Sequence, residues 1–79
     1  MLNTNPNLIY STTLDDKYIV KVERTGDYTA ILIVMEGDKE LLREDTTLAY
    51  RALFGPDVSD VATWQERAIK FVDEELPKL

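Results

Sequence analysis

Residues 18–44, YIVKVERTGDYTAILIVMEGDKELLRE, decide the fold predicted for this chain. Apolar and β-branched residues dominate the stretch, and two turn sequences, Thr25-Gly26 and Gly37-Asp38, interrupt it. Runs of this composition between short turns are typical of antiparallel strands. The predicted strands cover residues 18–24, 28–36 and 39–44.

A further strand is predicted before this stretch. Residues 8–13 are rich in apolar and β-branched side chains, and Asp15-Asp16 is a turn signal ahead of the next strand. The four strands together make an antiparallel meander over residues 8–44. Residues 1–7 include Pro6, which donates no backbone hydrogen bond, so this segment is expected to fray.

A short helix is predicted after the sheet, over residues 46–54. Asp45 or Thr46 can cap its first turn, since both side chains accept hydrogen bonds from free backbone amides. Gly55-Pro56 then supplies a left-handed cap residue and a stop.

A longer helix is predicted over residues 58–76, with Asp57 and Ser59 as candidate caps. On a helical wheel its apolar side chains fall in one arc of about 180°. The chain is therefore predicted to be a single α+β domain, residues 1–79. Its predicted architecture is a four-stranded antiparallel meander, a short helix, and a long C-terminal amphipathic helix packed on one sheet face.

Two-residue turns would fix which strand residues share a face of the sheet. They place Arg24 opposite Asp27 and Glu36 opposite Lys39, and each pair joins opposite charges. The core face predicted from this register holds Ile9, Tyr18, Val20, Val22, Ile31, Ile33, Met35 and Leu42. The second face holds Leu8, Tyr10, Ile19, Tyr28, Ala30, Leu32, Val34 and Leu41. A register slip of one residue would exchange the strand faces.

The second face is too apolar to remain in contact with water, because monomeric proteins rarely expose large apolar patches. Three coverings are open: the short helix, a second copy of the chain in a homodimer, or another protein. Trp64 and Phe71 lie at the edge of the long helix's apolar arc, as either core aromatics or interface anchors. The candidate partner interface is Tyr10, Tyr28, Leu32, Val34, Trp64 and Phe71.

Composition removes most catalytic chemistry from consideration. The 79 residues include no Cys and no His, which excludes disulfides, Cys/His zinc sites, thiol nucleophiles and imidazole bases. The two serines, Ser11 and Ser59, have no histidine to activate them and fit a strand and a helix cap. The carboxylates lack the spacing of a calcium loop. We therefore predict no catalytic residues, no metal site and no cofactor, and we expect that the protein is not an enzyme.

Charge indicates the class of partner. Nine Lys and Arg against fifteen Asp and Glu give a net charge of −6, which disfavours direct binding to nucleic acid or an anionic membrane. The first residues lack a secretory signal pattern, and no apolar run is long enough to span a membrane, so a cytoplasmic location is expected.

Two functions are consistent with these features. The first is a small, acidic, non-catalytic protein–protein interaction or regulatory module. Self-association through its apolar sheet face is one form that this function can take. The alternative is an inhibitor of the kind carried by phages and mobile elements, whose acidic surface occupies a nucleic-acid-binding protein. The candidate acidic surface is Asp15, Asp16, Asp27, Glu36, Asp38, Glu40, Glu44 and Asp45.

Overall fold

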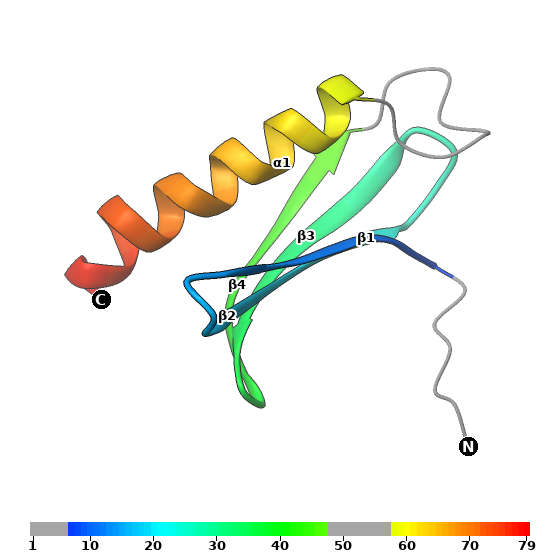
Figure 1. Cartoon of the computed structure of the whole chain (residues 1–79). Coiled ribbons are helices and arrows are strands. Elements are labelled where there is room, and N and C mark those ends of the chain that lie inside the picture. Colours follow the sequence, from blue (N-terminus) through cyan, green and yellow to red (C-terminus); the bar gives the residue numbers. More distant parts are fainter. Residues whose placement is uncertain (1–6, 48–57) are drawn as a thin grey trace.

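The computed structural model describes residues 7–47 and 58–79 and shows a four-stranded antiparallel sheet followed by a C-terminal helix (Figure 1). The strands follow one another in the sheet in the order β1-β2-β3-β4, which confirms the predicted meander and the mixed α+β class. Their bounds are Leu8–Leu14 for β1, Tyr18–Arg24 for β2, Thr29–Glu36 for β3 and Lys39–Thr47 for β4.

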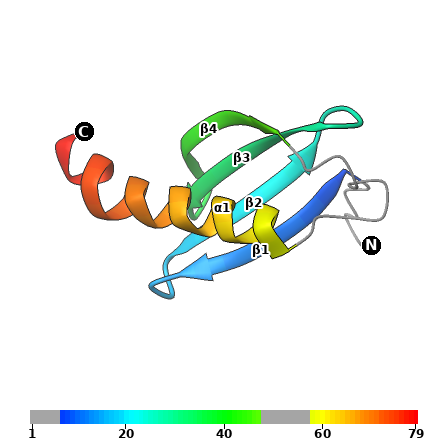
Figure 2. The same cartoon turned by 90° about the horizontal axis from the view of Figure 1, so that it is seen from above.

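The C-terminal helix begins as α1, Val58–Lys70, and continues through a π-helical segment, Phe71–Glu75, and a short 3-10 segment, Leu76–Lys78. The Leu76 amide donates to the Phe71 carbonyl oxygen five residues earlier, the hydrogen bond that defines a π-helix. Figure 2 shows this helix lying along one side of the sheet.

The prediction of a short helix is wrong at residues 46 and 47, because the last strand is longer than expected. Thr46 pairs with Ala30, and Thr47 pairs with Thr29, so both continue β4. Asp45, the other candidate for the helix cap, is also a strand residue and pairs with Ile31. The remainder of the predicted short helix, residues 48–54, lies outside the described residues.

One core cluster joins the helix to the sheet. Trp64 is the largest fully buried side chain, and its ring lies 5.7 Å from the Tyr10 ring, between centroids. Spacings of four and three residues place Trp64, Ala68 and Phe71 on the same side of the helix. The buried members of the cluster are Val20, Val22, Ala30, Leu32, Val34, Trp64, Ala68 and Phe71.

The loop between β2 and β3 corrects the predicted register. Arg24 pairs with Ala30 and not with Asp27, so five residues lie between the two paired positions in place of two. The Thr25 amide and hydroxyl bond to Thr29, at 3.0 Å to the carbonyl oxygen and 2.9 Å to Oγ1. The Arg24 guanidinium donates to the carbonyl oxygens of Gly26 and Asp27. These bonds provide partners for the Thr25 amide and for the Gly26 and Asp27 carbonyl oxygens within the longer loop.

This register shift of three residues exchanges the faces of β3. An odd shift turns each side chain of a strand to the opposite side. Ala30, Leu32 and Val34 therefore lie in the core cluster with the valines of β2. The residues predicted for the core face, Ile31, Ile33 and Met35, are absent from that cluster and lie on the other side of the sheet, although Ile33 is itself buried.

The β3–β4 turn forms as predicted at its tip but not beyond it. Glu36 pairs with Lys39, and Gly37 has a positive φ of 62°, the left-handed conformation that glycine adopts easily. A bulge then shifts the register, so Leu42 pairs with Val34. Leu41 and Leu42 both pack against the core cluster as partly buried side chains, which removes Leu41 from the second face.

Candidate interaction surface

The six residues predicted as a partner interface do not form one surface. Leu32, Val34, Trp64 and Phe71 are buried in the core, so a partner cannot contact them in this structure. The reason for Leu32 and Val34 is the register of β3, which turns them toward the helix. Trp64 and Phe71 are core aromatics, the first of the two roles that the sequence left open for them.

The two tyrosines of that set lie apart from each other. Tyr10 is half-buried beside Trp64, and its hydroxyl accepts a hydrogen bond of 2.8 Å from Gln65 Nε2. Tyr28 lies in the β2–β3 loop and is 51% exposed. Only Tyr28 keeps a large free surface, so the structure gives no support to an aromatic interface at these positions.

The side of the sheet away from the core cluster carries a second apolar surface, which we call the outer face. Register and alternation assign its residues, since they alternate along each strand with the buried ones. Three rows cross it from β1 to β4: Leu8, Glu23, Ile31 and Asp45; Ser11, Lys21, Ile33 and Arg43; Thr13, Ile19, Met35 and Glu40.

An apolar column runs along β3 in the middle of the outer face. Ile31, Ile33 and Met35 form it, and Ile19 of β2 extends it sideways opposite Met35. Ile19 is 40% exposed, Ile31 and Met35 are half-buried, and Ile33 is only 2% exposed. The cross-strand neighbours of Ile33 are Lys21 and Arg43, and such long side chains commonly lay their aliphatic stems along apolar neighbours.

Charged residues of both signs flank the apolar column. Lys21 and Glu23 lie on its β2 side, and Arg43 and Asp45 lie on its β4 side with Glu40. Arg43 and Glu40 form an exposed ion pair with a distance of 3.0 Å between Nη2 and Oε1. The outer face is therefore close to neutral in a chain whose net charge is −6.

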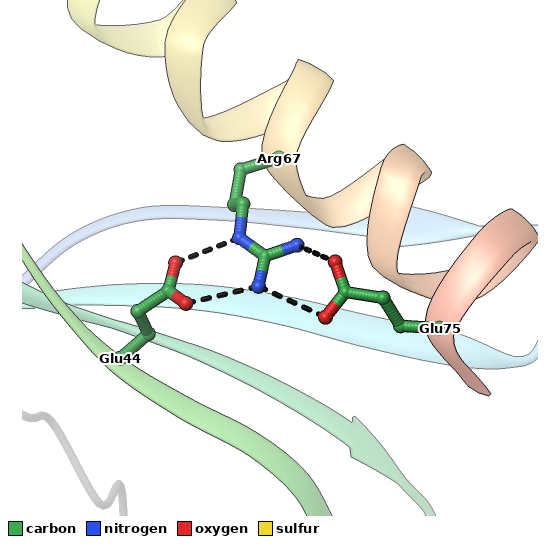
Figure 3. Close-up of polar contacts among 3 residues, drawn as sticks. All are labelled: Glu44, Arg67 and Glu75. Atoms are coloured by element: carbon green, nitrogen blue, oxygen red, sulfur yellow. Dashed lines mark hydrogen bonds and ion pairs between the residues drawn. The ribbon is translucent and has the colours of Figure 1, made fainter. Parts of the chain in front are cut away.

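A charged cluster on the other side of the sheet ties the helix to β4 (Figure 3). Arg67 Nε and Nη2 donate to the two carboxylate oxygens of Glu44, at 2.7 and 2.9 Å. The same guanidinium donates to the Glu75 carboxylate through Nη1 and Nη2. Paired N–H donors match a carboxylate in both position and charge, which makes this the strongest type of ion pair. Arg67 thus links Glu44 on the strand to Glu75, eight residues or about two helical turns further along the helix.

Arg67 lowers the pKa of both carboxyl groups, chiefly through these hydrogen bonds, which favour the charged form. A carboxyl group whose pKa is lower in the folded than in the unfolded state stabilises the fold at a pH above the usual carboxyl pKa of about 4.3. This stabilisation is lost as the pH falls below that value and the group is protonated.

We expect the urea midpoint to fall as the pH drops below about 4.3, and to fall less in Arg67→Gln, which lacks the guanidinium. The urea midpoints of the unchanged chain and of Arg67→Gln are measured by circular dichroism at a series of pH values from neutral to acidic. Equal acid sensitivity in the two proteins would show that the cluster does not contribute.

The predicted acidic surface divides into separate groups. Glu36 pairs with Lys17 at 3.1 Å, and Glu40 and Glu44 pair with arginines. The antiparallel order places the turns that hold Asp15, Asp16 and Asp38 at one end of the sheet, and the loop that holds Asp27 at the other. Asp45 pairs with Ile31 near the Asp27 end. The eight acids therefore do not form a continuous row.

Two shallow hollows lie at opposite ends of the sheet. The larger, about 360 Å³, is lined by Thr25, Thr29, Ala30, Asp45, Thr46 and Thr47. The smaller, about 230 Å³, is lined by Leu14, Asp15, Ile69, Val72 and Asp73. The larger lining combines threonine hydroxyls with the Asp45 carboxylate, and the smaller lining combines two carboxylates with apolar side chains. Within residues 7–47 and 58–79 there is no group of three acidic side chains placed to hold a metal ion.

Sequence reasoning did not identify the Arg67 cluster, which is the most strongly bonded polar group in the described residues. A helical wheel puts Arg67 on the polar arc, and Glu75 interrupts the apolar arc. That interruption was the one available signal. The strand partner, Glu44, is distant in sequence and could not be inferred from local pattern.

Comparison of the chain with protein-family models, curated proteins and solved structures gave no match. In the described part of the chain, no helix has the length and apolar character needed to cross a membrane.

Proposed function

We propose that this protein is a non-catalytic interaction module whose outer face binds a protein partner. The observation that supports the proposal is the apolar column Ile31, Ile33 and Met35, which lies on the opposite side of β3 from the core cluster. In this proposal the amphipathic C-terminal helix stays packed on one sheet face and serves as the scaffold, and the other face makes the contact.

The chemistry of the outer face favours a protein as the ligand. Phosphate backbones are held by Lys and Arg, and their affinity comes from released counterions. The outer face offers two bases, Lys21 and Arg43, against three acids. Its central apolar column with charges at the margin resembles the usual arrangement of protein interfaces, in which an apolar centre is surrounded by a polar rim.

We expect Ile31→Lys to lower partner capture by about tenfold or more without unfolding the protein. Ile31 lies between Glu23 and Asp45 in the sheet, so two carboxylates lie beside the new ammonium group. The measurement is affinity capture with the tagged chain from a nuclease-treated lysate of the source cells, with captured proteins quantified by mass spectrometry.

The matched control is Ile69→Lys, the same substitution at a 46% exposed position on the helix. A partner captured by the unchanged chain and the control but lost with Ile31→Lys supports the proposal. Equal loss with both variants, or capture unaffected by Ile31→Lys, contradicts it.

The same experiment distinguishes the acidic inhibitor. Apolar burial persists at high salt, while attraction between exposed charges is screened within about 8 Å at physiological ionic strength. A partner that is released by high salt and is indifferent to Ile31→Lys would favour an inhibitor that acts through its carboxylates.

A further inference from the structure

We infer that the outer face is self-complementary and pairs with a second copy of this chain about a two-fold axis that runs across the strands. The inference rests on the proposed function, because it takes the outer face as the contact surface and names its partner. It is carried by the positions of the charges in two neighbouring rows of that face.

The first of these rows is acidic at both flanks of the apolar column, and the next row is basic at both. Glu23 and Asp45 flank Ile31 in the acidic row. Lys21 and Arg43 flank Ile33 in the basic row, two residues along each strand. The two rows therefore have the same apolar centre and opposite charges at matching positions.

A two-fold axis in the interface, parallel to the rows and midway between them, places each row over the other row of the second copy. This rotation places each strand over the same strand of the second copy, and the two facing strands run in opposite directions. On β2, Lys21 of one copy then faces Glu23 of the other, and symmetry repeats the contact. At the centre, Ile31 lies over the Ile33 position of the other copy; because Ile33 is only 2% exposed, Ile31 supplies most of the accessible apolar surface there.

The β4 side follows the same geometry. Arg43 of one copy faces Asp45 of the other, although Arg43 also has its own ion pair with Glu40. Opposite charges therefore meet on both sides of the apolar column. A contact of this kind is isologous, as in most homodimers.

The alternative axis, parallel to the strands, is repulsive. It exchanges the β2 and β4 sides and keeps each row facing itself. Glu23 would then face Asp45 of the second copy, and Lys21 would face Arg43. Like charges placed opposite each other disfavour association, so the charges select the axis across the strands.

The size of the outer face sets the expected affinity. Four strands about 4.8 Å apart and seven residues long at about 3.3 Å each give on the order of 400 Å² per copy. Both copies would then bury roughly 800 Å², less than the ~1,200 Å² of the smallest stable interfaces. Each chain also carries a net charge of −6, which opposes association. We therefore expect a weak, concentration-dependent dimer with a dissociation constant on the order of 0.1 mM.

The test uses two charge reversals on β2, Lys21→Glu and Glu23→Lys. The first variant carries acids at both positions, and the second carries bases at both. Each alone should dimerise about tenfold more weakly than the unchanged chain, because like charges then face each other. An equimolar mixture should recover association to within about threefold, because every acid then faces a base of the other variant.

Sedimentation equilibrium from about 0.02 to 2 mM measures the dimer constants, and native mass spectrometry with one variant isotope-labelled identifies the mixed dimer. Circular dichroism checks that each variant is folded. Lys78→Glu is the matched control, since it makes the same charge change at an exposed position near the C-terminus.

Recovery in the mixture, together with an unchanged dimer constant for Lys78→Glu, is the expected result. A chain that stays monomeric over the whole range, a mixture that does not recover, or equal weakening by Lys78→Glu would overturn the inference. If the chain is monomeric yet a captured partner still depends on Ile31, only the self-pairing fails and the proposed function stands.

Discussion

Replacing Trp64 by alanine is expected to lower the free energy of unfolding by about 3–5 kcal/mol, the usual cost of truncating a fully buried large aromatic side chain. Trp64 is 1% exposed and stacks at a tilt on Tyr10, so the substitution removes helix–sheet contact as well as buried area. A domain of 79 residues has a total stability of about 4–12 kcal/mol. Urea unfolding monitored by far-ultraviolet circular dichroism measures the loss.

Trp64→Phe is the informative control for this prediction. Trp64 Nε1 is buried, and no described residue accepts a hydrogen bond from it. Phenylalanine keeps an aromatic ring and removes this donor, whose burial costs about 1–3 kcal/mol. We therefore expect Trp64→Phe to be at least about 2 kcal/mol more stable than Trp64→Ala. Similar stability of Trp64→Ala and the unchanged chain would contradict the placement of this ring in the core.

The order of the strands could be predicted from the sequence because turn residues mark each reversal. Asp15 and Asp16 both have positive φ, 55° and 54°, as expected of a tight hairpin turn, and Gly37 does the same at the β3–β4 turn. Asp and Gly tolerate this backbone conformation at low cost, so their positions show where the chain turns. The fold class follows from these local signals.

The faces of β3 could not be predicted in the same way, because its pattern has no alternation. Residues 30–35 are apolar without interruption, so either side of the strand could be the core side. Only the length of the preceding loop decides between the two. That length depends on hydrogen bonds that Arg24 donates to loop carbonyl oxygens and that Thr29 accepts from Thr25, and local turn preferences do not reveal these bonds.

The candidate surface inherits this error of register. Leu32 and Val34 were predicted for an open face on the assumption of a two-residue turn, and they lie in the core. The statement that both faces of β3 are apolar was independent of register, and it is what the outer face now rests on. The assignment of β3 side chains to one face of the sheet therefore depends on the length of the β2–β3 loop, which sets the register of the strand.

A pair of neighbouring substitutions on β3 tests that register directly. Leu32→Lys is expected to destabilise the protein by about 4 kcal/mol or more, because it buries an ammonium group without a free partner. Leu32 is 1% exposed, and its cross-strand neighbour Glu44 is already bonded to Arg67. Thermal and urea unfolding measure the loss.

Ile31→Lys, one residue earlier, is expected to cost no more than about 1 kcal/mol, because its side chain lies on the outer face between two carboxylates. With a two-residue turn after Arg24, the same pair would give the reverse outcome, since Ile31 would lie in the core and Leu32 outside it. An unfolded Leu32→Lys beside a folded Ile31→Lys therefore establishes which side of β3 faces the helix. That same result places Ile31 on the outer face, where the proposed contact with a partner requires it.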